Sequence, residues 1–121
     1  MKPIFDEKGT AVAFKQAEDL FALDGTHIAA FDGEWLVNHA GKSIGHFASG
    51  WIRDLDGDCV AFMDGASGGP MTPSTRIAPM PPAPGLTPML CIPGINPVAP
   101  LPSVKWSPTG WRGLKKKMSD G

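Results

Sequence analysis

The sequence predicts an all-β protein: four 16-residue β-hairpin repeats forming a shallow antiparallel barrel with pseudo-four-fold symmetry, followed by a proline-rich, polyproline II-like tail. Two observations lead to this prediction. A glycine recurs every 16 residues through the first half of the chain, at Gly9, Gly25, Gly41 and Gly57. Twelve of the 13 prolines lie at or after Pro70, which separates a four-hairpin domain, residues 1–64, from a Gly/Pro-rich tail, residues 65–121.

The four glycines stand in equivalent local sequences. Three residues after each glycine is a β-branched residue, the next residue is small, and five residues before the glycine is Ile or Leu. The residues around each glycine are turn formers, which fits a three-residue loop made of a type I turn and a glycine with positive φ. This loop predicts the strand pairs Ile4 with Val12, Leu20 with Ile28, Leu36 with Ile44, and Ile52 with Val60. A two-residue loop would instead pair the large apolar residue with the small one, which makes a poorer core.

The eight paired residues are expected to line the interior of the barrel. A single hairpin is barely stable in water, so the four copies must pack together. A ring achieves this, because each hairpin then covers the edge of its neighbour. The aromatic residues fit the repeat less regularly: Phe14 and Phe62 are five residues after their glycines, whereas Phe31 and Phe47 are six. Either a bulge in the middle copies or an exchange of the aromatic between sheet faces would explain this offset.

The tail has a pattern of its own. From Ile77 to Val104 an apolar residue occupies every third position: Ile77, Met80, Ala83, Leu86, Met89, Ile92, Ile95, Val98, Leu101 and Val104. A period of three is that of polyproline II, and a flexible low-complexity linker is the alternative. Fully extended, the stripe would be about 84 Å long, whereas a compact 64-residue head is about 28 Å across. The tail must therefore bend, most readily at Gly85 and Gly94, or run across several subunits.

Charge divides the chain at the same place as proline. Residues 1–64 carry five Lys/Arg against eleven Asp/Glu, a net charge of −6, and residues 65–121 carry six against one, a net charge of +5. This asymmetry favours a tail that folds onto the head. The three successive lysines, Lys115 to Lys117, are expected to form a solvated end. No segment resembles a signal peptide or a membrane span, so we expect a cytoplasmic protein with reduced thiols, and a Cys59–Cys91 disulfide only if the chain is exported.

The repeat also resembles a known family. The run DGTHIAAFDGEWLVNHAGKSIGHFASGWIRDLDGDCVAF, followed by GGP and a proline-rich tail, is similar to the four-fold beta flower domain family. The resemblance covers residues 1–64 and, more loosely, the tail. It implies a shallow barrel of four hairpin petals around an apolar central channel. A hydrophobic or lipid-like ligand in that channel is the function that the resemblance suggests, and it supplies no catalytic residues.

Residues with catalytic or metal-binding chemistry do not converge in the sequence. His27, His39 and His46 occupy three different positions of the repeat, so its symmetry implies no histidine cluster. The segment DLDGD at residues 54–58 resembles the start of a calcium loop, but strand residues follow where further ligands are needed. Cys59 has no His or Asn in its own hairpin to act as a base. We therefore expect no enzymatic activity, no cofactor and no metal site.

Two functions fit these observations. The first is a binding module for a hydrophobic small molecule or lipid, with a channel lined by Ile4, Val12, Leu20, Ile28, Leu36, Ile44, Ile52 and Val60. The second is a structural or interaction protein that assembles with itself or with a partner through the barrel and the tail. The tryptophans Trp35, Trp51, Trp106 and Trp111 are the candidate interaction residues, although packing within the chain is the expected role of the first two. The acidic head argues against nucleic acid as a partner.

Overall fold

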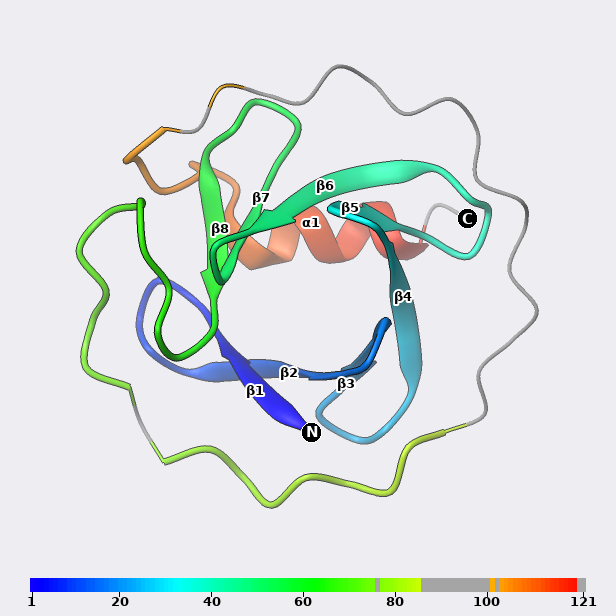
Figure 1. Ribbon diagram of the computed structural model, residues 1–121. Coiled ribbons are helices and arrows are strands. Elements are labelled where there is room, and N and C mark those ends of the chain that lie inside the picture. The colour runs from blue at the N-terminus through cyan, green and yellow to red at the C-terminus, as the bar shows by residue number, and fades with distance from the viewer. Residues whose placement is uncertain (76, 86–100, 102, 120–121) are drawn as a thin grey trace.

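The computed structural model describes residues 1–75, 77–85, 101 and 103–119, and its eight antiparallel strands close into one barrel in chain order (Figure 1). The strands are β1 (Lys2–Phe5), β2 (Ala11–Gln16), β3 (Asp19–Ala22), β4 (His27–Asp32), β5 (Trp35–Val37), β6 (Ser43–Ala48), β7 (Trp51–Arg53) and β8 (Cys59–Phe62). One helix, α1 (Gly110–Ser119), follows near the C-terminus. Among the described residues, no helix is both long and apolar enough to span a bilayer.

The turns within the hairpins have the form that the glycines predict. In the first, Gly9 donates its N–H to the Asp6 carbonyl at 3.0 Å and has a φ of +79°. Asp6 in turn donates to the Thr10 carbonyl at 3.0 Å, which closes a three-residue loop. The same bond from the turn glycine closes the β3–β4, β5–β6 and β7–β8 turns. A left-handed glycine after a type I turn gives the twist that the two strands need.

The predicted strand pairs are wrong. Phe5 pairs with Ala11, as the loop requires, but Ile4 pairs with Ala13 rather than with Val12. Val12 is therefore the extra residue of a second bulge. The other hairpins contain the same shift, which pairs Leu20 with Ala29, Leu36 with Gly45, and Ile52 with Ala61. The loop was correctly predicted, and the error came from extending its register past a bulge that sequence spacing does not reveal.

The residues of the predicted interior nevertheless form one cluster. Six of them, Ile4, Leu20, Leu36, Ile44, Ile52 and Val60, are at most 2% exposed, and Val12 and Ile28 pack against them half-buried. In the first, second and fourth hairpins, the bulge allows two successive residues of the second strand to join this cluster. Phe31 also belongs to it and Phe47 packs against it, whereas Phe62 belongs to a second cluster around Trp51. Because all four hairpins have the bulge, the aromatic offset is an exchange between sheet faces.

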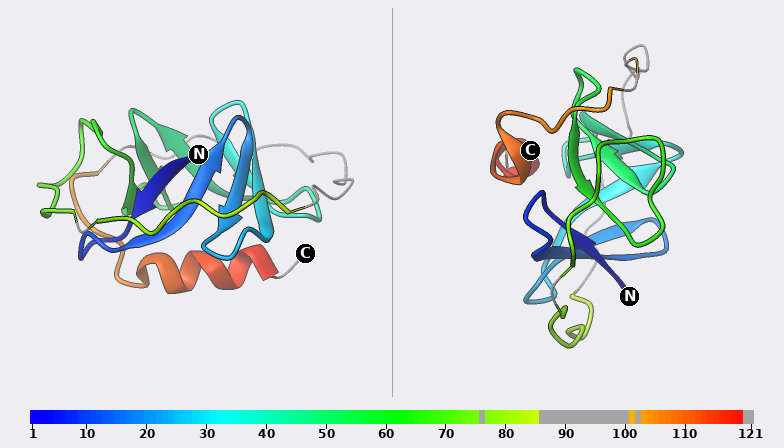
Figure 2. Two further views of the ribbon diagram at one scale, coloured as in Figure 1. Left: turned by 90° about the horizontal axis from the view of Figure 1, so that it is seen from below. Right: turned by 90° about the vertical axis from the view of Figure 1, so that its left-hand side faces the viewer.

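Helix α1 lies across one end of the barrel (Figure 2) and was not predicted. The sequence interpretation placed a solvated lysine end here. No proline follows Pro108, and Trp111, Leu114 and Met118 fall on one helical face. Leu114 and Met118 are buried in the interior cluster and Trp111 packs against it. The lysines occupy the opposite, exposed face, so α1 is an amphipathic cover for this end of the barrel.

The described parts of the tail contact the barrel. Residues 65–75 and 77–85 run around its outside (Figure 1), and Gly85 donates its N–H to the Gly25 carbonyl at 2.7 Å. Further on, Cys59 donates to the Lys105 carbonyl at 2.8 Å and accepts from the Ser107 N–H at 2.7 Å. The intervening Trp106 is thereby bridged in parallel to β8. The middle of the predicted stripe, residues 86–100 with the expected hinge at Gly94 and with Cys91, lies outside the described residues.

Candidate functional site

At the end of the barrel opposite α1, one repeat position supplies several of the side chains. The residues six after the turn glycines are Lys15, Phe31, Phe47 and Met63. The Phe31 and Phe47 rings meet edge to face with centroids 5.1 Å apart. The Lys15 Nζ atom lies 5.1 Å from the Phe31 centroid and 5.6 Å from that of Phe47. A cation is thus held over an aromatic pair.

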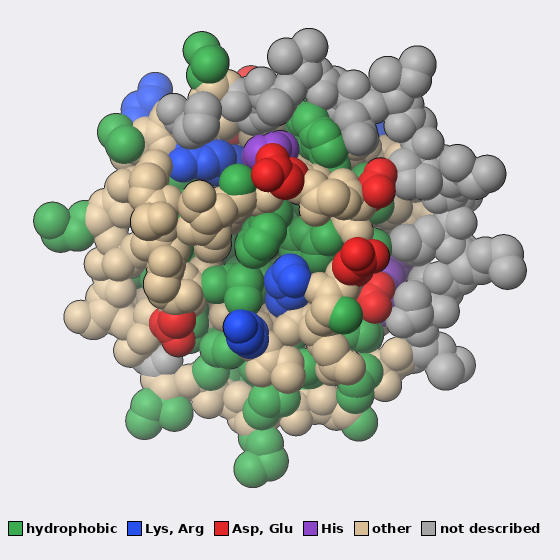
Figure 3. Space-filling model, in the orientation of Figure 1, with side chains coloured by type: hydrophobic (Ala, Val, Ile, Leu, Met, Phe, Trp, Pro, Cys, Tyr) green, Lys and Arg blue, Asp and Glu red, His purple; other side chains and the backbone are tan. Residues whose placement is uncertain are grey.

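A hollow of about 480 Å³ occupies this end, which we call the mouth. Its lining consists of Met1, Lys2, Lys15, Gln16, Ala17, Phe47 and Met63. In the space-filling view, Lys or Arg side chains stand beside hydrophobic ones near the centre of this face (Figure 3). The mouth therefore combines an apolar floor with cationic groups.

Two lysines oppose each other at the mouth. Lys2 on β1 pairs directly with Lys15 on β2 in the strand ladder, and both line the hollow. Like charges directly opposite each other on neighbouring strands are unfavourable. The Lys15 ammonium donates to the Ala17 carbonyl at 2.6 Å, which offsets part of this cost. An anion bound between the two lysines would remove the remaining repulsion.

The backbone fixes the mouth residues in place. Phe31 donates its N–H to the Glu18 carbonyl at 2.7 Å, and Phe47 donates to the Glu34 carbonyl at 2.6 Å. Met63 donates to the Gly50 carbonyl at 2.9 Å in the same way. Each bond joins the end of one hairpin to the turn that precedes the hairpin, so the side chains above these bonds are pre-organised.

A family model described as 4-fold beta flower protein matches residues 2–114, which include the whole barrel and the first half of α1. The chain belongs to the 4-fold beta flower family. This confirms the resemblance drawn from the hairpin run. No curated protein and no solved structure matches this beta flower chain. The family description names an architecture and no activity, so a function has to be argued from the site itself.

The eight residues predicted to bind a ligand lie beneath the mouth of the beta flower barrel. They are in mutual contact within the interior cluster, together with two side chains of α1. The hollow at the mouth is lined by none of the eight, but Phe47 and Met63, which do line it, pack against the same cluster. The sequence therefore located the apolar interior correctly, and it did not single out the repeat position that forms the mouth.

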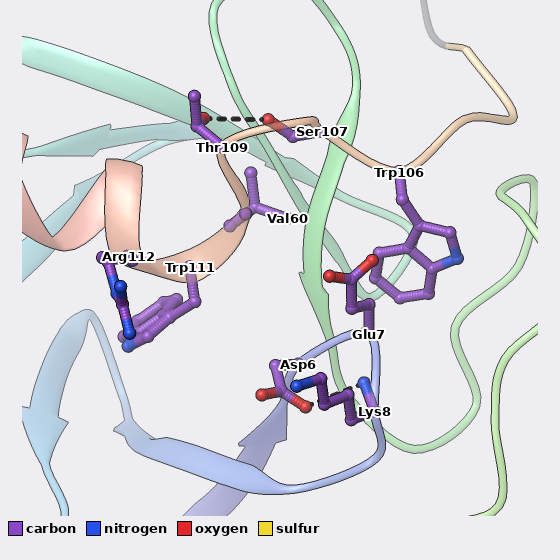
Figure 4. Close-up of a pocket in the computed structure, with 10 residues that line it drawn as sticks. Asp6, Glu7, Lys8, Val60, Trp106, Ser107, Thr109, Trp111 and Arg112 are labelled. Carbon is purple, nitrogen blue, oxygen red and sulfur yellow. Dashed lines mark hydrogen bonds between the residues drawn. The ribbon is translucent and has the colours of Figure 1, made fainter.

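A second hollow, of about 310 Å³, lies at the other end, between the first hairpin turn and the start of α1 (Figure 4). Asp6, Glu7 and Lys8 line one side, and Trp111 and Arg112 line the other. Charges of both signs face this hollow: Asp6, Glu7 and Lys8 come from the first hairpin turn, and Arg112 comes from α1. The mouth, where one sign of charge stands over an apolar floor, is the better candidate for a ligand site.

The four tryptophans make packing contacts of different kinds. Trp51 is 1% exposed, and its ring centroid lies 5.6 Å from that of Phe62 and 5.4 Å from that of Trp106. Trp35 is half-buried and meets the His46 ring edge to face at 5.0 Å. Trp111 packs against the interior cluster from α1. Trp51 and Trp106 together attach the end of the tail to β7 and β8.

The structure brings together two histidines that the repeat gave no reason to associate. His27 Nδ1 lies 2.9 Å from His39 Nε2, and His27 Nε2 lies 2.9 Å from an Asp19 carboxylate oxygen. Burial lowers the pKa of His39, and the nearby His27 lowers it further. Among the described residues, no group of three His, Cys, Asp or Glu side chains is placed to hold a metal ion.

Cys59 is a buried free thiol whose sulfur lies 3.9 Å from the Ser103 carbonyl oxygen. Burial raises the pKa of this thiol, and the Asp58 and Asp54 carboxylates raise it further, against a lowering by the Arg53 guanidinium. A thiol with a raised pKa is a poor nucleophile at neutral pH. Cys59 therefore serves as a buried packing residue rather than as a nucleophile.

Proposed function

We propose that this beta flower protein is a small, non-enzymatic binding module whose mouth accepts a hydrophobic or lipid-like ligand with an anionic head group. The observation that supports this most directly is the Lys15 ammonium held over Phe31 and Phe47, with Lys2 directly opposite. An acyl chain carrying a carboxylate matches such a surface in both of its parts.

The chemistry of the mouth suggests how such a ligand would bind. Its apolar chain would lie over Phe47, Met63 and Met1, and the eight interior residues would form the floor beneath. Its carboxylate would accept hydrogen bonds from Lys15 and Lys2, and charge-assisted bonds are the stronger kind. A hollow of about 480 Å³ is within the range that small-molecule sites occupy.

Finer features of the architecture belong to the same proposal. We treat the hairpins as four petals of a shallow barrel with pseudo-four-fold symmetry, which is supported by their common register shift. We treat the tail as polyproline II, which is supported by its period of three and its prolines. A cytoplasmic location is supported by the free thiol of Cys59, since reducing compartments keep thiols unpaired.

A structural or interaction protein is the second candidate, and a different observation favours it. Met71, Ile77 and Met80 of the tail are 93%, 100% and 89% exposed. Apolar side chains turned to solvent along the tail suit contact with a second copy or with another partner. In this alternative the packed interior serves stability alone.

Binding of a fluorescent fatty acid to the delipidated full-length chain tests the ligand proposal. We expect saturable binding, and we expect competition by an unlabelled fatty acid to be stronger than by the matching fatty alcohol. Lys15→Met keeps the apolar stem and removes the charge, so it should weaken fatty-acid binding about tenfold, the equivalent of one charge-assisted hydrogen bond. Lys42→Met is the matched control, because Lys42 is exposed in the β5–β6 turn and does not line the mouth.

The possible results separate the two candidates. Absence of saturable binding to the folded wild-type protein would exclude the ligand role. Equal losses in the two lysine variants would show that the mouth is not the site. Concentration-dependent association of the wild-type chain without ligand binding would support the interaction protein instead.

A further inference from the structure

The tail contains a nine-residue repeat beside its period of three. Residues 70–105 divide into PMTPSTRIA, PMPPAPGLT, PMLCIPGIN and PVAPLPSVK. Each segment begins with proline followed by Met or Val, and its eighth residue is Ile, Leu or Val. Four tail segments therefore follow four hairpins in the sequence. The third segment, residues 88–96, lies outside the described residues, as do residues 76, 86–87, 97–100 and 102 of the other segments, and all of these are compared by sequence alone.

Hydrogen bonds between the tail and the hairpin turns have a spacing that matches this repeat. Gly85 donates its N–H to the Gly25 carbonyl at 2.7 Å, and Ser103 donates to the Gly57 carbonyl at 3.2 Å. The two donors are 18 residues apart in the tail, and the two acceptors are 32 residues apart in the barrel. Each 16-residue hairpin thus corresponds to nine tail residues.

Close contacts at the turn glycines independently give the same ratio of nine tail residues for each hairpin. A methyl group placed on Gly9 would overlap the Ser74 carbonyl oxygen, and one placed on Gly25 would overlap the Ala83 carbonyl oxygen. Ser74 and Ala83 are nine residues apart, as the repeat requires. These glycines are needed both for their positive φ and for the approach of the tail.

One buried side chain bonds two tail residues that are far apart in the sequence. Arg53, 5% exposed, donates from Nη1 to the Ser103 carbonyl at 2.6 Å and from Nη2 to the Gly68 carbonyl at 3.0 Å. It also donates to the Gly57 carbonyl of its own turn at 2.7 Å. The equivalent positions of the other hairpins hold Phe5, Phe21 and Val37. Only the fourth hairpin, where Gly68 and Ser103 meet, carries at this position a side chain that can donate to both carbonyls.

The β1–β8 seam is the weakest junction between neighbouring strands of the barrel. β1 and β8 pair only where Phe5 faces Phe62, whereas the other neighbouring strands, all within the described residues, pair at three or four positions. The tail leaves β8 beside this seam, and its other end returns there with Trp106 packed against Trp51 and Phe62. We infer that the described parts of the tail between Gly68 and Ser103 form a belt in register with the hairpins, with nine tail residues for each hairpin. Arg53, which bonds both Gly68 and Ser103, then holds the β1–β8 seam closed.

Hydrogen exchange of the wild-type full-length chain tests this inference without any variant. The amide protons of Gly85 and Ser103 should exchange as slowly as those of the barrel strands. Exchange at the rate of an exposed loop at both positions would overturn the belt.

Arg53→Val tests this role of Arg53, because Val37 already occupies the equivalent position of the third hairpin. We expect the Tm to fall by about 10 °C, since the Gly68 carbonyl and the Ser103 carbonyl lose a buried donor. We also expect faster exchange of the Ser103 amide. An unchanged Tm with unchanged Ser103 exchange would show that Arg53 does not hold the seam.

Gly25→Ala and Gly33→Ala form a matched pair that tests the register. Both glycines have positive φ, but Gly33 has open space around it, and Ala17 stands at the equivalent position of the first hairpin with a φ of +53°. Gly25→Ala should lower the Tm by about 5 °C more than Gly33→Ala, because only the first methyl group meets the belt. Equal Tm values would contradict the inference, and ligand binding at the mouth plays no part in the result.

Discussion

The two ends of the barrel are built from the same hairpins and finished differently. At the base, α1 places Leu114 and Met118 into the interior cluster, so apolar side chains meet an apolar cover. At the mouth, in the part of the chain that the structure describes, the hollow is bordered instead by Met1, Lys2 and Lys15. One end is covered by the apolar face of α1, and the other presents charge over half-buried apolar side chains.

This difference shows where the repeat was modified. The interior positions hold similar apolar residues in all four hairpins, whereas the mouth position holds Lys15, Phe31, Phe47 and Met63. A purely structural rim would need no cation, and a lysine opposite another lysine has an electrostatic cost. We therefore expect substitutions at the base to change mainly stability, and substitutions at the mouth to change mainly binding.

Leu114→Ala should have the largest effect. The side chain is 3% exposed and in the interior cluster, so its truncation leaves a cavity at the base and should lower the free energy of unfolding by about 3 kcal/mol. Urea denaturation measures this loss. Lys116→Ala, on the exposed face of the same helix, should change it by less than about 0.5 kcal/mol. Similar values for the two variants would mean that α1 does not seal the base.

Asn38→Asp should have the next largest effect. Asn38 is fully buried, accepts two N–H groups of its turn, and donates from Nδ2 to the Lys117 carbonyl of α1 at 3.1 Å. A carboxylate keeps the turn but faces that carbonyl without a proton to donate, which should cost about 2 kcal/mol. Asp6→Asn makes the reverse change at the equivalent, partly exposed turn position and should be nearly neutral. A neutral result for both would show that this tie does not hold α1.

The base illustrates how far the sequence could lead. The glycine repeat predicted the hairpin turns, and the eight residues predicted for the interior all belong to the central cluster or pack against it, because period and side-chain size determine both. It did not predict the bulge at Val12 and its equivalents, because a bulge changes pairing without changing composition. The helix was not predicted because the prolines that precede Gly110 favour polyproline II, although Trp111, Leu114 and Met118 have the spacing of one helical face.

The mouth was harder to predict than the base. Lys15, Phe47 and Met63 share one repeat position but not one residue type, and the other lining residues lie outside that position, so no repeated residue type marks the mouth. The contact between His27 and His39 is harder still, because these residues come from different repeat positions and meet only when neighbouring hairpins pack. Repetition in sequence reveals what the hairpins have in common, and the functional differences lie in the departures from it.

Phe47→Ala sharpens the contrast between stability and binding. Phe47 is half-buried at the mouth, so truncation should cost about 1.5 kcal/mol, less than a fully buried phenylalanine. It also removes one of the two rings beneath Lys15. The loss in the free energy of fatty-acid binding should therefore be larger than the loss in the free energy of unfolding. Fluorescence titration and urea denaturation of the same sample measure the two effects. A large stability loss with unchanged binding would place Phe47 with the base residues.

The smallest expected effect is a pH dependence of stability. It arises at the His27–His39 contact, which lies neither at the mouth nor at the base. Burial, and then the proximity of His27, lower the pKa of His39 below its ordinary value of 6.5. The unfolded chain therefore takes up a proton at His39 at a higher pH than the folded chain does. Stability should be fully present above pH 6.5 and should decrease as the pH falls from there towards the lowered pKa. Thermal unfolding from pH 8 to pH 5, compared between wild type and His39→Gln, measures this decrease against the background of the other groups, including Asp19, which bonds His27. The wild type should lose more Tm than the variant over this range. Parallel curves would mean that the His27–His39 contact does not couple folding to pH.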